Sequence, residues 1–98
     1  MKKVKLFQSK GVEGFLKYSF LFDEINSEDF KNDFELVAEH DYEDDLDDFE
    51  ISEMIFDKYN RDDRPNGRTH RSMCVGDIVQ INDNMYVCRT CGFERLDL

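Results

Sequence analysis

Apolar and polar residues alternate most regularly between Phe34 and Tyr42, where every second side chain from Phe34 onward lies on one face. A period of two residues is typical of a β-strand with one buried face, so this segment predicts a strand. Shorter alternations predict strands at residues 3–8 and 15–22. The two glycines between those segments predict that the two strands pair as a hairpin.

Helical periodicity replaces the alternation in two places. Residues 47–59 carry apolar side chains at spacings of three and four, behind a run of Asp residues that can cap a helix and that suit the positive end of its dipole. This pattern predicts the main helix. Asn26 or Ser27 can cap a shorter helix. The polar segment 60–70 contains a Pro-Asn-Gly turn signal and predicts a loop.

The C-terminal third predicts a second hairpin. Strands at 77–82 and 85–90 flank turn residues, and a last short strand is expected between Phe93 and Leu98. We therefore expect a single α+β domain over residues 1–98, a small, mostly antiparallel sheet with a C-terminal β-hairpin and one main helix packed on it. The residues expected in its core are Phe34, Leu36, Ala38, Ile51, Ile55, Val79 and Val87.

Charge is segregated along the chain. The formal net charge is −10, yet residues 23–63 hold eighteen carboxylates against three basic side chains, a local balance of −15. Phosphates are repelled by an acidic protein, so we expect no direct binding of nucleic acid. No stretch is apolar enough to span a bilayer or to form a signal peptide, and three Cys do not fit a disulfide framework. We therefore expect a cytoplasmic protein with no membrane attachment.

The acids are densest between Asp41 and Glu50, where seven of ten side chains are carboxylates and aromatic residues are interleaved. Runs of like charge usually form a solvated face. They can also resemble the phosphate rows of a nucleic acid and bind the basic groove of another protein. The second interpretation makes the following residues candidates for protein binding: Asp41, Glu43, Asp44, Asp45, Asp47, Asp48, Glu50 and Glu53.

Candidate metal and catalytic residues are few. The only metal-like spacing is that of His70, Cys74, Cys88 and Cys91. Because one Cys-x2-Cys pair alone is present and Cys88 ends a predicted strand, three reduced thiols are favoured over structural zinc. His40 lies on the apolar face of its strand, which favours a half-buried histidine bonded to backbone over a general base. We find no phosphate loop and no nucleophile elbow, and expect no enzyme activity, metal or cofactor.

The C-terminal half of the chain carries a set of short motifs: Ile55-Phe56-x3-Asn60, Pro65, Arg71-Ser72-Met73-Cys74-Val75-Gly76-Asp77-Ile78-Val79, Tyr86-Val87-Cys88 and Gly92-Phe93. In these motifs the chain resembles the YodL-like domain, found in small proteins of low-GC Gram-positive bacteria and their plasmids, integrative elements and phages. The resemblance covers mainly residues 51–98. It implies a mobile-element accessory domain and supplies no catalytic residues. The chain departs from the family at Cys74, where a Ser is usual, and at Cys91.

Two functions fit this pattern. In the first, a small non-enzymatic phage or mobile-element protein binds a host protein, one with a basic nucleic-acid groove, and inhibits or modulates it through the acidic surface. In the second, the acidity only keeps an accessory domain soluble, and the loop and hairpin within residues 60–88 contact an unrelated partner. The concentrated charge and the interleaved aromatic residues favour the first function.

Overall fold

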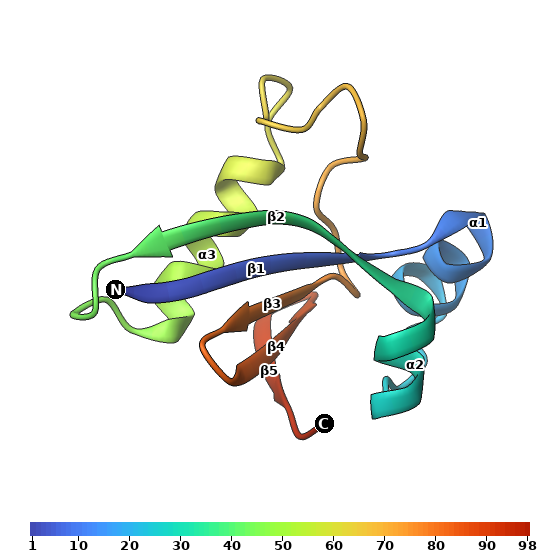
Figure 1. Cartoon of the computed structure of the whole chain (residues 1–98). Helices are drawn as coiled ribbons and strands as arrows, with labels where there is room; N and C mark the ends of the chain where they lie inside the picture. The colour runs from blue at the N-terminus through green and yellow to red at the C-terminus, as the bar shows by residue number, and fades with distance from the viewer.

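The fold, seen in a computed structural model that describes residues 1–98, is built on one five-stranded sheet (Figure 1). Its strands are β1 (Lys2–Ser9), β2 (Phe34–Tyr42), β3 (Ile78–Ile81), β4 (Asn84–Arg89) and β5 (Gly92–Leu96). They lie in the order β2-β1-β3-β4-β5, and all neighbours are antiparallel. The helical elements are α1 (Gly11–Gly14), the π-helix η1 (Phe15–Phe20), α2 (Ser27–Asp33) and α3 (Asp48–Tyr59). The α+β class expected from the sequence is confirmed.

Local signals in the sequence set the ends of several elements. Asn26 caps α2 and forms a capping box with Asp29, as its side-chain oxygen accepts from the Asp29 N–H at 2.8 Å. Asn82, in the turn between β3 and β4, has a φ of 52°, a left-handed conformation that Asn tolerates better than most residues. No helix is long and apolar enough to cross a membrane.

A β-bulge in β2 changes which side chains share a face. The pairing shifts between Leu6, opposite Ala38, and Phe7, opposite Leu36, so that Val37 is an extra residue in β2. Phe34 and Leu36 therefore lie on one face of the sheet, and Ala38 lies on the other. The prediction that these three residues share a buried face is wrong. Phe34 is buried, Ala38 is half-buried, and 46% of Leu36 is exposed.

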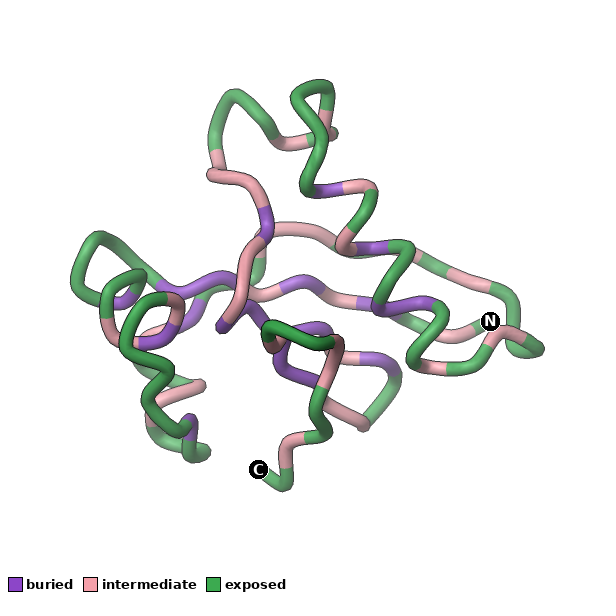
Figure 2. The backbone as a smooth tube through the Cα atoms, turned by 180° about the vertical axis from the view of Figure 1, so that it is seen from behind, coloured by how far each residue is buried: buried purple, intermediate pink, exposed green.

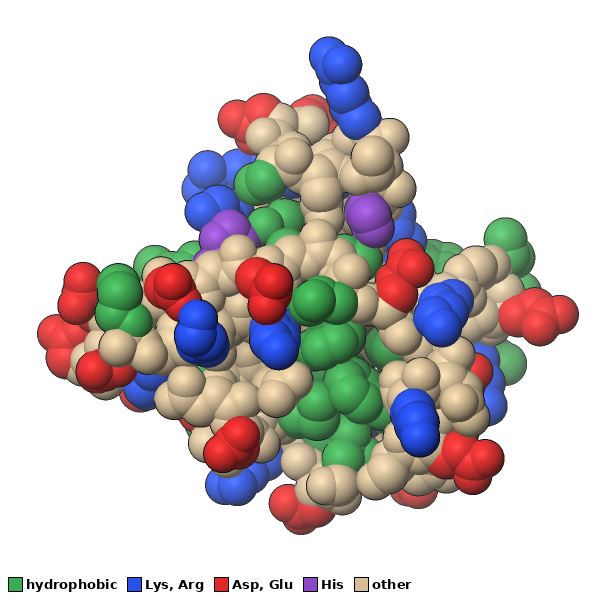
Figure 3. Space-filling view, viewed as in Figure 1, with side chains coloured by type: hydrophobic (Ala, Val, Ile, Leu, Met, Phe, Trp, Pro, Cys, Tyr) green, Lys and Arg blue, Asp and Glu red, His purple; other side chains and the backbone are tan.

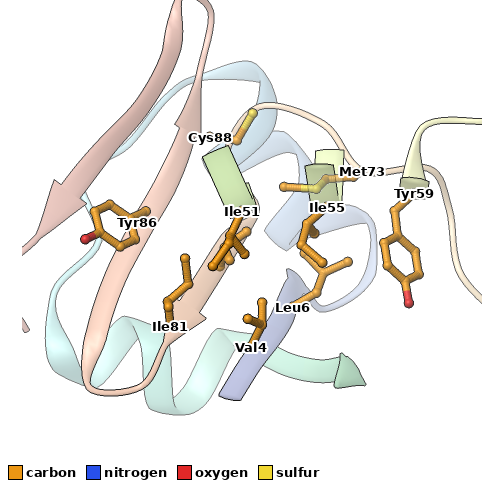
Figure 4. Close-up of a cluster of buried hydrophobic side chains, with 10 residues drawn as sticks. Val4, Leu6, Ile51, Ile55, Tyr59, Met73, Ile81, Tyr86 and Cys88 are labelled. Atoms are coloured by element: carbon orange, nitrogen blue, oxygen red, sulfur yellow. The ribbon is translucent and has the colours of Figure 1, made fainter. Parts of the chain in front are cut away.

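Two apolar clusters cover the two faces of the sheet. Helix α3 packs on one face, where Figure 4 shows its buried side chains directed toward those of the strands; this cluster contains Val4, Leu6, Ile51, Ile55, Tyr59, Met73, Val79, Ile81, Tyr86 and Cys88. The opposite face carries a smaller cluster with residues from η1 and the α2 region: Tyr18, Ile25, Phe34, Ile78 and Val87. Buried residues are accordingly concentrated in the strands and on one side of α3 (Figure 2).

The predicted hairpin between residues 3–8 and 15–22 is wrong, because residues 11–20 are helical. Both edges of β1 are already paired, one with β2 and the other with β3, so β1 has no free edge for a further strand. Of the alternating apolar residues, Tyr18 alone is buried, and its hydroxyl donates to Asp33 at 2.5 Å. The helical segment packs through this ring against Phe34.

The helical segment also lies directly on Gly76, which has a φ of 95°. A Cβ at this position would lie 2.5 Å from the carbonyl oxygen of Tyr18. The glycine is therefore required both by its backbone conformation and by the close approach of a second backbone.

We predict that Gly76→Ala lowers the free energy of unfolding by about 3 kcal/mol or more, measured by urea denaturation. The matched control is Gly92→Ala. Gly92 also has a positive φ, 117°, but a Cβ added there would meet no atom within 4 Å, so only the backbone cost of about 1–2 kcal/mol applies. Equal losses in the two variants would show that the contact with Tyr18 contributes nothing.

Candidate functional site

Asp47, at the centre of the acidic run, caps helix α3. Its carboxylate accepts hydrogen bonds from the backbone N–H groups of Phe49 and Glu50, at 2.8 and 3.0 Å. Such a cap satisfies N–H groups that no helical carbonyl reaches. One side chain predicted for partner binding is thus already engaged in holding the first turn of α3.

Asp48 faces inward and joins α3 to the sheet. It accepts hydrogen bonds from Lys2 of β1 at 3.1 Å and from the Tyr86 hydroxyl of β4 at 2.6 Å, and 17% of its side chain is exposed. Burial alone would raise the pKa of Asp48, but the hydrogen bonds from Tyr86 and Lys2 lower it below its usual value. Its carboxylate therefore stabilises the fold and is not available to a partner.

The remaining acids of the run are exposed. Asp41 lies 3.9 Å from the Lys3 ammonium, and Asp44 lies 3.2 Å from the amino group of Met1. Four further carboxylates are exposed and take part in none of the ion pairs of the structure: Glu43, Asp45, Glu50 and Glu53. Figure 3 shows several Asp and Glu side chains at the end of the molecule where Figure 1 places the turn between β2 and α3.

Apolar side chains lie among these unpaired acids. Phe49 and Met54 on α3 are 52% and 44% exposed, and the Phe49 ring packs edge-on against Tyr86 with centroids 5.3 Å apart. We call the set formed by Glu43, Asp45, Phe49, Glu50, Glu53 and Met54 the acidic surface. It combines four carboxylates that form no ion pair with two exposed apolar side chains.

The motif that carries the family resemblance surrounds a buried ion pair. Asp77 is fully buried and accepts two hydrogen bonds from the Arg71 guanidinium, at 2.7 and 2.9 Å. It also accepts from the Gln8 side chain at 3.1 Å and from the Cys74 backbone N–H at 3.0 Å. Burial raises the pKa of Asp77 and its hydrogen bonds with Arg71 oppose that rise, whereas burial lowers the pKa of Arg71 and Asp77 raises it above its usual value. The two parallel hydrogen bonds are the geometry of a guanidinium–carboxylate ion pair. The motif is therefore structural.

A cavity of about 430 Å³ opens beside Arg71 and is also lined by Phe15, Glu35 and His70. Because Asp77 occupies both terminal nitrogens of the guanidinium, the cavity does not present that charge to an anion. His70 and Glu35 lie 3.8 Å apart at its rim. The Nδ1 of His70 is also hydrogen-bonded to the hydroxyl of Thr69, its neighbour on the exposed loop, at 3.0 Å.

The four residues with metal-like spacing are not brought together. Cys88 is buried in the cluster under α3, and burial raises the pKa of its thiol to about 12. The Cys74 sulfur accepts a hydrogen bond from Arg71 at 3.2 Å, while Cys91 is exposed and His70 lies on the loop. All three cysteines are free, and no group of three His, Cys, Asp or Glu side chains is placed to hold a metal ion.

His40 is half-buried, but its partner differs from the one we expected. The ring Nε2 is hydrogen-bonded to the Tyr59 hydroxyl at 2.5 Å, and not to backbone. Burial, followed by the nearby charge of Lys58, lowers the pKa of His40. The residue therefore connects β2 to the last turn of α3.

One exposed apolar segment was not foreseen from the sequence. The alternation between residues 15 and 22 indicated a strand with one buried face, whereas most of its large side chains point to solvent in the helical conformation. The exposed set is Val12, Phe15, Leu16, Phe20, Leu21 and Phe22. The positive φ of Phe22, 56°, marks the end of the helical turn. Gly11 and Gly14, predicted to form the turn of a hairpin, instead begin and end α1, immediately before this segment.

The loop at residues 60–70 stands away from the sheet beyond the end of α3 (Figures 1 and 2). Its arginines are partly engaged within the protein: Arg61 pairs with Asp57, and Arg64 donates to the backbone carbonyls of Arg61 and His70. Arg68 is exposed and forms no ion pair. Two of the three arginines of the loop are thus engaged with groups of the protein itself.

Comparison with known proteins assigns the family. The sequence profile of the YodL-like domain matches residues 4–98, and the chain belongs to that family. The motifs indicated it mainly from residues 51–98, with a looser resemblance in Val4–Phe7 and Phe34–Tyr42, and the match extends over the segment between those strands as well. An uncharacterized protein of Acanthamoeba polyphaga mimivirus is 36% identical over 59 residues, covering 49% of this chain and 55% of that protein. The chain thus spans about half the length of this curated relative. No solved structure matches the chain.

We predict that Asp48→Asn lowers the free energy of unfolding at pH 7 by about 1–3 kcal/mol, because the amide loses the charge that Lys2 and Tyr86 bind. The matched control, Asp45→Asn, removes an exposed, unpaired carboxylate and should change it by less than about 0.5 kcal/mol. Urea denaturation measures both.

The loss of unfolding free energy in Asp48→Asn should depend on pH. Since the folded-state pKa of Asp48 is lowered, its contribution is present above the unfolded-state pKa of about 4 and disappears as the pH falls through the folded-state value. The difference between wild type and Asp48→Asn should therefore shrink below about pH 4. A difference that stays constant into acid would contradict the inward-facing, ionised carboxylate.

Proposed function

We propose that this protein is a non-enzymatic binding protein that engages a partner protein with a basic surface. The observation that carries the proposal is the acidic surface, in which four exposed carboxylates without ion pairs are accompanied by the exposed side chains of Phe49 and Met54. Solubility alone requires only dispersed charge. The carboxylates of the acidic surface are instead concentrated at one end of the molecule, where they repel one another.

The composition of the acidic surface suits recognition of a nucleic-acid-binding groove. Such grooves carry Lys and Arg side chains that track a phosphate backbone, together with flatter apolar areas on which bases stack. Carboxylates would steer the partner and set the register, while Phe49 and Met54 would supply apolar contact. By occupying the groove, the protein would inhibit or modulate the partner without catalysis, metal or cofactor.

The cellular setting of the proposal rests on the family. The resemblance implies small proteins of mobile elements and phages, and the mimivirus relative is itself encoded by a virus. We therefore propose a host protein as the partner and the cytoplasm as the place of binding. Direct contact with nucleic acid is disfavoured by the net charge of −10.

We predict that neutralising the acidic surface abolishes capture of the partner. The variant combines Glu43→Gln, Asp45→Asn, Glu50→Gln and Glu53→Gln, and capture is measured by pull-down from a lysate of a low-GC Gram-positive bacterium at low and high salt. The wild type should retain an identified nucleic-acid-handling protein at low salt and lose it at high salt, because exposed charge pairs are screened.

The matched control neutralises four exposed acids elsewhere: Asp23→Asn, Glu24→Gln, Glu28→Gln and Asp97→Asn. Each variant changes the net charge by +4, from −10 to −6, so a difference between them reports position and not total charge. The control should still bind. Binding by the acidic-surface variant equal to that of the wild type, or loss only on changing Arg64 or Arg68, would place the interface on the loop.

A further inference from the structure

Strand β2 forms an open edge of the sheet. It pairs with β1 on one side, and no strand pairs with its other side. An open edge presents a row of backbone N–H and C=O groups that can accept another strand. Natural edges are commonly protected by Lys, Pro or a β-bulge; β2 contains neither Lys nor Pro, and its bulge at Val37 lies outside the segment from Glu39 to Asp41.

The ladder shows which backbone groups of β2 face outward. The backbone N–H and C=O groups of Lys3 point toward β3. The carbonyl of Lys3 accepts a hydrogen bond from the Asn82 N–H at 2.8 Å, and the N–H of Lys3 donates to the Asn82 side chain at 3.0 Å. Successive residues of a strand direct these groups to opposite sides, so the backbone N–H and C=O groups of Val4 point toward β2, where its partner is His40. Glu39 and Asp41, which flank His40, therefore direct their N–H and C=O groups away from the sheet.

The side chains beside these outward groups are acidic. Glu39 and Asp41 lie opposite Lys5 and Lys3 in the ladder, with ammonium-to-carboxylate distances of 4.0 and 3.9 Å. Their carboxylates remain 63% and 56% exposed. Exposed ion pairs of this length contribute little and leave the carboxylates able to bind a second cation.

An exposed apolar residue continues the same face. Leu36 lies opposite Phe7 and is 46% exposed, next to the half-buried side chains around the smaller cluster. Figure 3 shows this face as a hydrophobic area with charged side chains beside it. A strand added to β2 would find carboxylates at one end of this face and apolar surface at the other.

The charges argue against a second copy of this chain as the added strand. Two β2 strands paired side by side around His40, antiparallel or parallel and in register, bring the acids of one against the acids of the other, and like charges directly opposite are destabilising. The other face of β2 is different, because Lys58 lies close enough to His40 to lower its pKa, after the larger effect of burial. A fitting strand has basic side chains on the Glu39 face and uncharged ones on the His40 face.

We propose that β2 accepts an extended basic segment of a partner protein as an additional strand, with Lys or Arg at alternate positions opposite Glu39 and Asp41. This inference deepens the proposed function and rests on it for the basic character of the partner. Main-chain hydrogen bonds hold the segment, and the alternating side chains select it.

The test uses the full chain and a short capped peptide of alternating lysine and threonine. The peptide should bind, and hydrogen exchange of the Glu39 and Asp41 amides should slow in the complex, because these outward N–H groups gain partners. The same peptide with N-methylated lysine amides keeps its charge but loses the donors of the ladder, and it should bind roughly tenfold more weakly. An alternating glutamate and threonine peptide should not bind.

Two variants at one position separate backbone from charge. Glu39→Pro removes the outward N–H and the carboxylate, whereas Glu39→Ala removes only the carboxylate, so the proline variant should bind the peptide several-fold more weakly than the alanine variant. Proline is tolerated where the N–H faces solvent. An unchanged far-ultraviolet circular dichroism spectrum confirms that each variant is folded.

Three results would overturn the added strand: no binding of the lysine peptide, equal binding of the N-methylated peptide, or equal binding by the two Glu39 variants. These results would leave the acidic surface untouched, because the pull-down tests different residues. Conversely, a pull-down unaffected by the acidic-surface variant, together with slowed exchange at Glu39 and Asp41, would reject the acidic surface and retain the added strand.

Discussion

The buried ion pair between Arg71 and Asp77 is the contact on which the arrangement of the chain depends. A buried carboxylate is costly unless it is both paired and hydrogen-bonded, and Asp77 obtains its partners from the loop, from β1 through Gln8, and from the backbone of Cys74. These contacts fix the start of β3 beside β1. They also place Gly76 under the backbone of Tyr18, so the helical segment is positioned by the same constraint.

Elements with local signals were predictable from the sequence. The strand from Phe34 to Tyr42, helix α3 with its Asp47 cap, and the turn at Asn82 each depend on residues that are neighbours in the chain. Residues 15–22 were not, because an alternating pattern does not reveal whether a neighbouring strand has a free edge. Both edges of β1 are taken by strands that lie far away in sequence. The bulge at Val37 was missed for a similar reason, since it is visible only in the pairing.

The sequence predicted the charge of the candidate site, but it did not predict which of its side chains are exposed. Composition identified the acidic run, and the structure divides its members by contacts with distant residues. Lys2 and Tyr86, on two different strands, turn Asp48 inward, whereas Glu50 and Glu53 on the same helix remain exposed. Spacing along a helix predicts which residues share a face. It does not predict which polar groups of the sheet will contact that face.

The position of β1 within the sheet has a consequence for synthesis on the ribosome. Strand β1 pairs with β2, which follows some way along the chain, and with β3, which begins only at Ile78. Until that residue has left the exit tunnel, one edge of β1 lacks its partner, and α3 lacks the side chains of β3 and β4 that complete its cluster. The sheet therefore cannot be completed before β3 has been synthesised, and until then the nascent chain exposes an unpaired strand edge and apolar side chains, which chaperones and proteases recognise.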